Sequence, residues 1–477
     1  DIESARPLAE LVLEKTYGNP FFAKQCLLSL NENGAIYFSY TDNKWVYNLE
    51  KAKEASISEN VVDLMLAQIN GLTADIQNIL KIAACIGDRF HIDLLNEISG
   101  QKLEDTIDQL SIAIKKGLLL PVFSWNKLEL EDYKFLHDRI HQAAYLLSND
   151  AEKKSIHLTI GKFLLEKGTI SETEETVYEI ADHLNYSIDL ITSNSELVKL
   201  AEVNFMASKR ARNSNAYEAS LNYVVKALEV LPKESFKNHG SLLQKLYLQR
   251  AESEHLCNNH ESAEKYYDLA LSIAENPLDN ALICRSKIHY YTNLGKFKEA
   301  YQIGIEALVP LGVKLPKHFK PPLLILELLK YIWYRGSKKI SDISHHRIMQ
   351  DENLKMAVLL MSTIAKSAYQ IKPELCIAVC TKIVNVCLKH GNTEGISIGY
   401  LAFGPIFIGS ILNRKSAGYK FGELTLELVE QYKSVNYKAE THFVVGYFAL
   451  PWRKPAIEME RYWQIAYESG LELGDFF

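Results

Sequence analysis

The chain has 477 residues, of which 47% are hydrophobic and 23% are charged. This composition excludes a disordered chain, and the length allows about three domains of roughly 150 residues. The net charge of −6 argues against general binding to nucleic acid or to an anionic membrane, so neither is an expected partner. Seven irregularly spaced cysteines, and no apolar run near the roughly 20 residues of a membrane span, favour the cytoplasm.

The first fifty residues predict two helices and a β-hairpin. One helix begins at Pro7, a favoured first-turn residue, and the next begins with Asn19 as N-cap and Pro20 in its first turn. Residues 34–48 carry β-branched and aromatic residues on both sides of a turn, which is typical of a hairpin. The chain begins without Met in what reads as the middle of a helix, so we expect a segment of a longer protein.

The next segment predicts helices packed against a small hairpin, which describes a winged-helix domain. Four helical patterns, the first with capping residues at its start, cover residues 56–72, 73–87, 91–99 and 102–117. Two strand-like runs separated by a polar turn follow at 118–123 and 132–136. In DNA-binding relatives of this fold a helix such as 102–116 reads the groove, but here its three lysines face three acids. A neutral helix binds phosphates poorly, so we interpret the wing as an intramolecular joint, with DNA binding as the weaker alternative.

Beyond residue 170 the pattern is almost entirely helical and repetitive. Ala227, Ala270 and Ala307 occupy matching positions in three similar segments, with offsets of 43 and 37 residues. The tetratricopeptide period of about 34 residues is shorter, but its helix-pair logic is the same. We therefore predict stacked helical hairpins forming a curved superhelix, interrupted at 311–350 by a proline-bearing linker, an amphipathic helix and a basic segment.

The predicted fold is mainly α, with a winged-helix domain and small β-hairpins followed by a tetratricopeptide-like superhelix. The predicted divisions are a first pair of helices, a hairpin linker, the winged helix, helical repeats, the linker with its amphipathic helix, and further repeats, at residues 1–34, 35–56, 57–170, 171–310, 311–350 and 351–477.

Sequence motifs for catalysis are absent. There is no GxxxxGK[ST] phosphate loop, GxGxxG, HExxH or GxSxG, and no kinase HRD and DFG pair, so no catalytic residue is predicted. Cys376, Cys380 and Cys387, with His390 nearby, have a spacing that allows a metal site. The interpretation that we adopt is small buried side chains in helix packing, so no metal is predicted.

The stretch "FLHDRIHQAAY" places His137 and Asp138 where a strand becomes a helix. A catalytic pair would need a third member, and the sequence offers none. An acid in the first helical turn interacts favourably with the helix dipole, so Asp138 is predicted to cap the helix or to pair with Arg139. His137 is then left to face outward.

Three motifs, "YGNPFF", "AACIGDRF" and "FLHDRIHQAAY", resemble the distal part of the signal-transduction ATPases with numerous domains (STAND). The resemblance implies that Asn19 and Pro20 belong to the helical lid near the nucleotide base, and that His137 reaches the β-phosphate of ADP. These roles need the phosphate-loop domain, which this chain lacks. Leu136 stands where the best-known version has Met.

More specifically, "YKFLHDRIHQAAY", "KHGNTEGISIGYLAFG", "HFVVGYFALPW" and "GLELGD" are similar to the ATPase and repeat region of large bacterial multi-sensor serine/threonine and histidine kinases. That resemblance implies ATP or ADP as cofactor of the intact parent and none in this fragment alone. Its partners in cis would be an upstream phosphate-loop ATPase domain and downstream GAF and kinase domains, and the repeats would take a protein or small ligand. A MalT-like transcriptional activator and a free-standing repeat adaptor remain the alternatives.

Overall fold

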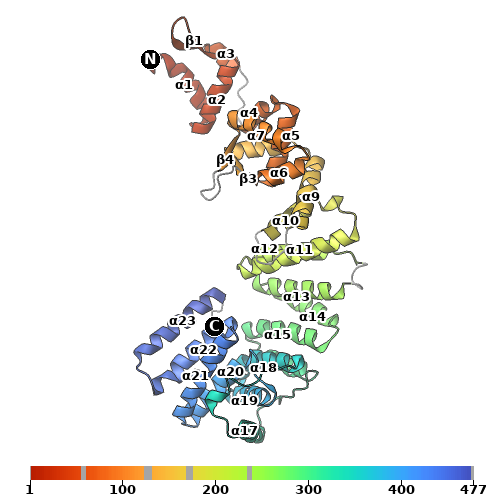
Figure 1. Ribbon diagram of the computed structural model, residues 1–477, viewed down its shortest axis with the longest axis vertical. Helices are drawn as coiled ribbons and strands as arrows, with labels where there is room; N and C mark the ends of the chain where they lie inside the picture. Colours follow the sequence, from red (N-terminus) through yellow and green to blue (C-terminus); the bar gives the residue numbers. More distant parts are fainter. Residues whose placement is uncertain (1, 55–60, 123–131, 168–175, 234–238, 474–477) are drawn as a thin grey trace. The chain divides into compact units, whose positions relative to one another are not determined.

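A computed structural model describes residues 2–54, 61–122, 132–167, 176–233 and 239–473, and the chain forms two compact units, 1–203 and 204–477 (Figure 1). The expected capping residues before 61 and the polar turn after 122 lie outside the described residues. Both units are built mainly from helices, and the few strands are short and antiparallel, as the sequence predicts. Among the described helices, none is both long and apolar enough to cross a membrane.

The first elements of the N-terminal unit share a small hydrophobic core. They are α1 (Ile2–Thr16), α2 (Pro20–Glu32), β1 (Ile36–Ser39), β2 (Lys44–Tyr47) and α3 (Leu49–Glu54). The hairpin is the predicted one, with Ile36 paired to Tyr47 and Ser39 to Lys44. The predicted start of the first helix at Pro7 is wrong, because α1 begins five residues earlier and contains Pro7. A proline near a helix start costs few hydrogen bonds, so it marks the boundary only loosely.

A second core in the same unit joins helices to a three-stranded sheet. Its elements are α4 (Val61–Asn70), α5 (Ala74–Ile86), β3 (Arg89–His91), α6 (Ile92–Ser99), α7 (Leu103–Lys115), β4 (Leu119–Val122), β5 (Asp132–Phe135) and α8 (Asp138–Leu146). The strand order is β3-β5-β4, with both neighbouring pairs antiparallel. Ile79, Leu95, Leu110 and Ile140 are fully buried between the helices and this sheet. The strand β3 was not part of the predicted hairpin.

Two further helices and a single turn complete the unit, and the next helix contains the boundary between the two units, after residue 203. They are α9 (Asp150–Lys167), α10 (Thr176–Tyr186), the single turn η1 (Ile188–Leu190) and α11 (Asn194–Asn213). Helices α9 and α10 pack so closely at Gly161 that a Cβ there would lie 2.6 Å from Leu184.

The C-terminal unit is a succession of helices that pack against their neighbours in the chain. They are α12 (Tyr217–Val230), α13 (Gly240–Leu256), α14 (His260–Ser272), α15 (Pro277–Asn293), α16 (Phe297–Leu308), α17 (Pro321–Arg335), η3 (Ile340–Asp342), α18 (Glu352–Ile371), α19 (Pro373–His390), α20 (Ile396–Leu401), the π-helical η4 (Ala402–Ile411), α21 (Lys415–Gln431), α22 (Val435–Phe448), η5 (Leu450–Trp452) and α23 (Ile457–Leu473).

One turn geometry recurs between the paired helices of this unit. Asn215, Asn258 and Gly295 all have positive φ, at 59°, 62° and 71°. In each turn the next residue donates its N–H to the carbonyl five positions back, as in Ala216 to Ala211 at 2.8 Å. This is a Schellman closure of the first helix, for which Asn and Gly are the favoured residues. The turns are separated by the same 43 and 37 residues as the alanines, which are all buried.

A buried polar network ties α11, α12 and α13 together. Ser208 donates to the Ser220 carbonyl at 2.8 Å, and the hydroxyls of Ser220 and Ser253 lie 2.8 Å apart. The Gln249 amide donates to the Ser208 hydroxyl at 3.0 Å. All four side chains are buried, so each depends on the others for its hydrogen bonds.

Gln249→Ala should destabilise the C-terminal unit by about 1–3 kcal/mol, because it leaves buried hydroxyls short of a partner. Urea denaturation measures this loss. Gln464→Ala on α23, where the side chain is exposed, is the matched control and should be neutral. Equal stability of the two variants would mean that the network contributes nothing.

The segment before α18 is held by a short β-like crossing. Met349 donates its N–H to the Asn392 carbonyl at 2.9 Å, and Asn392 donates to the Arg347 carbonyl at 2.8 Å. The Asn392 side chain is buried and donates to the Ile343 carbonyl at 2.7 Å. Gly391 lies in this crossing at φ +119°, where a Cβ would approach the Arg347 carbonyl oxygen to 2.6 Å. This arrangement, the 347–392 crossing, attaches the α17 segment to α19.

Candidate functional site

The junction of β5 with α8 builds the histidine motif. Phe135 is buried in the core, and its N–H donates to the Asp88 carbonyl at 3.0 Å. The next N–H, of Leu136, donates to the Leu118 carbonyl at 3.0 Å. These bonds hold the strand up to its last residue, so His137 is placed at the helix start in an extended conformation, with φ −157° and ψ 145°.

His137, and not Asp138, makes the cap hydrogen bond of α8. Its Nδ1 accepts from the N–H of Arg139 at 3.2 Å. The prediction that Asp138 is the cap is therefore wrong, because Asp138 is already the first helical residue and its exposed carboxylate contributes only through the helix dipole. The Arg139 guanidinium donates to Gln142 at 2.9 Å. Since Nδ1 of His137 accepts, the neutral ring carries its proton on Nε2, which is the donor a phosphate oxygen needs.

His91 repeats this cap geometry at the start of α6. Its Nδ1 accepts from the N–H of Asp93 at 3.2 Å. Two histidine caps in one unit show that the cap alone is a structural device. His91 is therefore the natural control for any role of His137 beyond capping.

Asn19 and Pro20 lie at the start of α2. The Asn19 side chain caps the helix by accepting from the Phe22 N–H at 3.1 Å, and Pro20 occupies the first turn. Both are exposed, and the preceding Tyr17 and Gly18 have positive φ. These residues border the first core, whereas His137 and Asp138 border the second, so the structure does not gather them around one core.

Sequence reasoning missed the second histidine of the motif. The Nε2 of His141 lies 2.9 Å from the Ala84 carbonyl oxygen and so connects α8 to α5. Its ring packs edge-on against Phe135, with centroids 5.1 Å apart, and is followed by Tyr145 at 6.4 Å. The Tyr145 hydroxyl lies 3.3 Å from Nε2 of His157 on α9. A continuous line of rings therefore runs from the motif into the next helices.

This line ends in a pair of histidines. The Nδ1 atoms of His157 and His183 lie 2.6 Å apart, so one donates and the other accepts. The pKa of both side chains is lowered to about 4, mainly by burial, and the charges of His183 and Lys153 contribute to the shift of His157. Both rings are neutral at pH 7. The two residues are 26 positions apart in the chain, and no local spacing signals their contact.

The C-terminal unit contains a groove of about 360 Å³, lined mainly by residues of α13 and α15. Arg212 and Glu252 form an ion pair in it, and the Ser286 hydroxyl donates to Glu252 at 2.7 Å. The Arg285 guanidinium donates to the Thr363 hydroxyl at 3.3 Å. Burial and the neighbouring His260 lower the pKa of His255, which also lines the groove. The charged and hydroxyl groups of the groove are therefore engaged with partners inside the protein.

The cysteines of α19 are buried. The sulfurs of Cys376 and Cys380 lie 3.9 Å apart, and Cys387 is fully enclosed. Burial raises the pKa of the Cys387 thiol far above its ordinary value. Within the part of the chain that the structure describes, no group of three or more His, Cys, Asp or Glu side chains could hold a metal ion.

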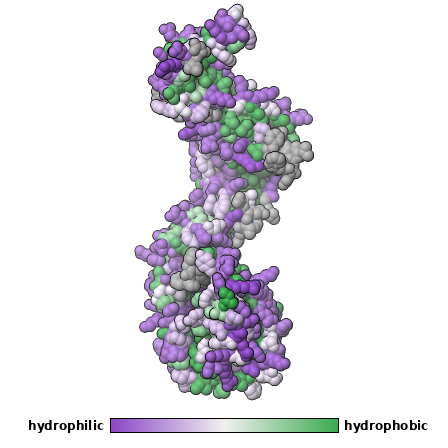
Figure 2. All heavy atoms as spheres, turned by 90° about the vertical axis from the view of Figure 1, so that its left-hand side faces the viewer, coloured by the Kyte–Doolittle hydropathy of each residue, from purple (hydrophilic) through white to green (hydrophobic). Residues whose placement is uncertain are grey.

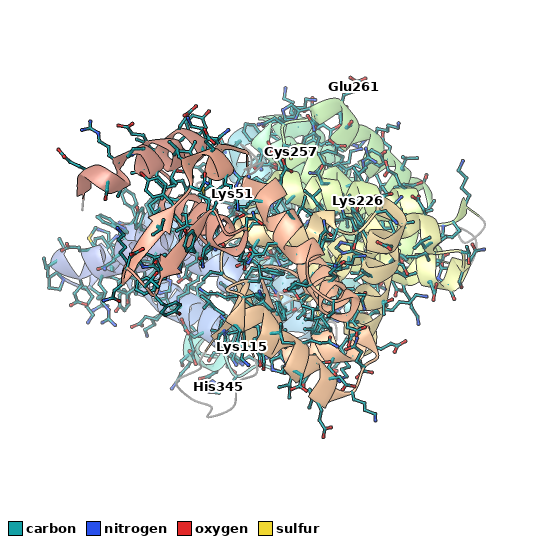
Figure 3. All side chains as sticks on the ribbon, turned by 90° about the horizontal axis from the view of Figure 1, so that it is seen from above. Lys51, Lys115, Lys226, Cys257, Glu261 and His345 are labelled. Carbon is teal, nitrogen blue, oxygen red and sulfur yellow. The ribbon has the colours of Figure 1, made fainter. Side chains whose placement is uncertain are left out.

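The charges of α7 bear on the DNA alternative. Lys115 and Lys116 are exposed at the C-terminal end of the helix (Lys115 is labelled in Figure 3). Glu104 and Asp105 are exposed in the first turn. The two acids therefore lie at the start of α7 and the two lysines at its end, which is the orientation that interacts favourably with the helix dipole.

No family model matches the chain. It is similar to hybrid signal transduction histidine kinase G of Dictyostelium discoideum, with 25% identity over 89% of this chain and 14% of that protein. It is also similar to the peroxide stress-activated histidine kinase mak3 of Schizosaccharomyces pombe, with 21% identity over 63% of this chain and 13% of that protein. The chain thus spans about a seventh of the curated relatives that it matches, and both relatives are histidine kinases.

Among solved structures, the chain is similar to a STAND protein with a tetratricopeptide repeat sensor from Pyrococcus horikoshii. The identity is 16%, the TM-score is 0.31, and the match covers 96% of this chain and 72% of that one.

Proposed function

We propose that this chain is a regulatory and scaffolding segment of a STAND-type ATPase signalling protein of the histidine kinase class. The observation that carries the proposal is the match to a histidine kinase over 89% of the chain. In this proposal, residues 57–170 are a winged-helix domain, and the helices that follow are tetratricopeptide-like repeats that bind partners. The expected domains in cis are an upstream phosphate-loop ATPase domain and downstream GAF and kinase domains.

The proposed switch is the start of α8. His137 donates from Nε2 to the β-phosphate of ADP, which is bound by the upstream domain, and Asn19 and Pro20 contribute the lid. The geometry that supports this is the Nδ1 cap bond at 3.2 Å, which leaves the proton on Nε2, together with the helix N-terminus, which favours anions. The line of rings from His141 to His183 then offers a packed path along which the position of α8 affects α9 and α10. The surface of the repeats would bind a protein or small ligand.

His137→Ala in the longer parent protein should weaken ADP binding by about 10- to 100-fold, because a charge-assisted hydrogen bond to phosphate is lost. Basal kinase output should rise as the ADP-bound resting state loses stability. Calorimetric titration with ADP measures the first effect, and autophosphorylation measures the second.

The matched control is His91→Ala, which removes the same kind of cap from α6. That variant should lose a similar amount of stability and keep its ADP affinity. If His137→Ala binds ADP as tightly as His91→Ala does, His137 is a cap and not a nucleotide sensor.

A further inference from the structure

Helix α17 turns its charged side chains toward the protein and many of its apolar side chains toward the solvent. Glu327 accepts from Lys330 at 2.8 Å, and from Lys382 and Asn385 of α19 at 3.3 and 2.7 Å. Glu327 and Lys330 are the only charged residues between Pro321 and Arg335. The carboxylate of Glu327 therefore lies on the side of the helix that packs against α19.

The outward side of α17 is a row of large exposed hydrophobic residues. Trp333 is 82% exposed and Ile332 is 65% exposed. With two others they follow the spacing i, i+4, i+7 and i+8, which lies on one side of a helix. The complete set is Leu323, Ile325, Leu326, Leu329, Ile332 and Trp333, and we call it the α17 apolar row. Hydrophobic atoms reach the surface at the lower end of the molecule in Figure 2, the end at which Figure 1 has α17.

Basic residues stand at both ends of this row. Residues 311–350 contain eight Lys or Arg against two Asp or Glu, a local net charge of +6 in a chain whose total is −6. The exposed lysines that flank the helix are Lys314, Lys317, Lys320, Lys338 and Lys339.

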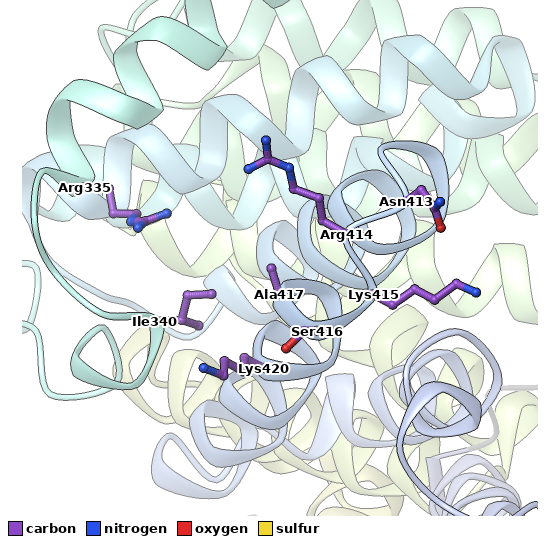
Figure 4. A pocket seen from close by; sticks show the side chains of 8 residues that line it. All are labelled: Arg335, Ile340, Asn413, Arg414, Lys415, Ser416, Ala417 and Lys420. Carbon is purple, nitrogen blue, oxygen red and sulfur yellow. The ribbon is translucent and has the colours of Figure 1, made fainter.

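A cationic cavity of about 520 Å³ lies at the C-terminal end of α17. Arg335 lines it from α17, and Arg414, Lys415 and Lys420 line it from the start of α21 (Figure 4). Within the described chain, the last three form no ion pair with an acid. Their charge adds to the positive end of the α21 dipole, so the cavity favours a phosphate group.

We propose that the α17 apolar row, its flanking lysines and this cavity form a docking surface for an anionic lipid membrane. The helix lies in the interface with Trp333 and Ile332 among the acyl chains, and the cavity takes a lipid phosphate. Peripheral helices of this kind combine an apolar side with basic residues and tryptophan. None of the six apolar side chains lines the cavity, so the row and the cavity are two separate parts of this surface.

The first test is vesicle flotation of the 477-residue chain. It should bind vesicles of phosphatidylcholine with about 30% phosphatidylserine and leave pure phosphatidylcholine vesicles unbound. Ile332→Ser with Trp333→Ser should weaken binding by about 10-fold or more, since two anchors no longer enter the bilayer. Ile457→Ser, which changes a side chain 74% exposed on α23, is the matched control and should bind as the unchanged protein does.

The second test addresses the charge. Lys338→Gln with Lys339→Gln, and separately Arg414→Gln with Lys420→Gln, should each weaken binding by roughly 10-fold or more, because each basic residue near an anionic surface contributes about 1 kcal/mol. Lys226→Gln on α12, an exposed lysine far along the chain, should have no effect (Figure 3). Unchanged vesicle binding by the Arg414 and Lys420 variant would show that the cavity does not contribute to the docking surface.

A third measurement needs no variant. Hydrogen exchange of the unmodified protein should slow within 321–335 when the anionic vesicles are added. Equal binding to neutral vesicles, unchanged binding by the Trp333 variant, or protection of 321–335 by soluble polyglutamate but not by vesicles would each overturn the proposal, the last in favour of an acidic protein partner.

Discussion

Gly391→Ala should destabilise the C-terminal unit by about 3 kcal/mol or more, the largest single effect that we expect. A Cβ at this position would lie 2.6 Å from the Arg347 carbonyl oxygen and 2.8 Å from the Met349 nitrogen. Both neighbours are backbone atoms in the 347–392 crossing, so neither can rotate away. The φ of +119° adds backbone strain for any residue with a side chain.

Urea denaturation measures the stability, and hydrogen exchange of residues 343–392 locates the change. The control is Gly312→Ala, because Gly312 also has positive φ, at 81°, but nothing lies within 4 Å of its Cβ position. That variant carries backbone strain alone and should cost about 1–2 kcal/mol. Equal losses in the two variants would show that the close approach at the crossing has no energetic weight.

Acidification from pH 7 to pH 5 should selectively loosen α9 and α10, and lower the unfolding midpoint of the N-terminal unit by roughly 5 °C. Burial lowers the pKa of His157 and His183 to about 4 in the folded state, while the ordinary value is 6.5. Between these values the unfolded chain binds more protons than the folded chain. The stability is therefore complete above about pH 6.5 and is lost as the pH falls toward 4.

The geometry gives the reason for this sign. With 2.6 Å between the two Nδ1 atoms, only one proton fits between the rings, so a second proton breaks the hydrogen bond. Neither neighbour of His157 is an acid that would stabilise a protonated ring. The charge of Lys153 lowers the pKa of His157, and the Tyr145 hydroxyl lies against its Nε2.

Hydrogen exchange of α9 and α10 as a function of pH measures this effect. His157→Phe with His183→Leu should make the exchange of these helices insensitive to pH between 5 and 7. His91→Gln, which changes a histidine of the same unit outside the pair, should keep the unmodified pH dependence. A pH dependence that survives in the double variant would assign the effect to other groups.

The elements of this fold were largely predictable from local pattern. The hairpin at 36–47, the helices of the 61–115 segment and the strand-to-helix change at Phe135 follow from periodicity and turn residues, which act within a few positions. The repeated turns at Asn215 and Asn258 follow for the same reason, since a left-handed residue closing a helix is a local requirement.

The candidate site was predictable only in part. The sequence predicts that a histidine and an acid begin α8, but which of them makes the cap depends on the backbone conformation set by the hydrogen bonds of β5 to its neighbours. The net charge of −6 for the whole chain likewise conceals the local charge of +6 in residues 311–350. Our membrane proposal therefore departs from the prediction, made from the net charge, that an anionic membrane is not a partner.

The sequence by itself therefore determined the mainly helical class, the hairpin at 36–47 and most helices of the 61–115 segment, because these depend on contacts between near neighbours. Only the tertiary structure decided that His157 contacts His183, that the Arg347 backbone packs against Gly391, and that the α17 apolar row is exposed. Those features depend on which elements pack together across tens of residues. Packing of that range leaves no periodic signal in the chain.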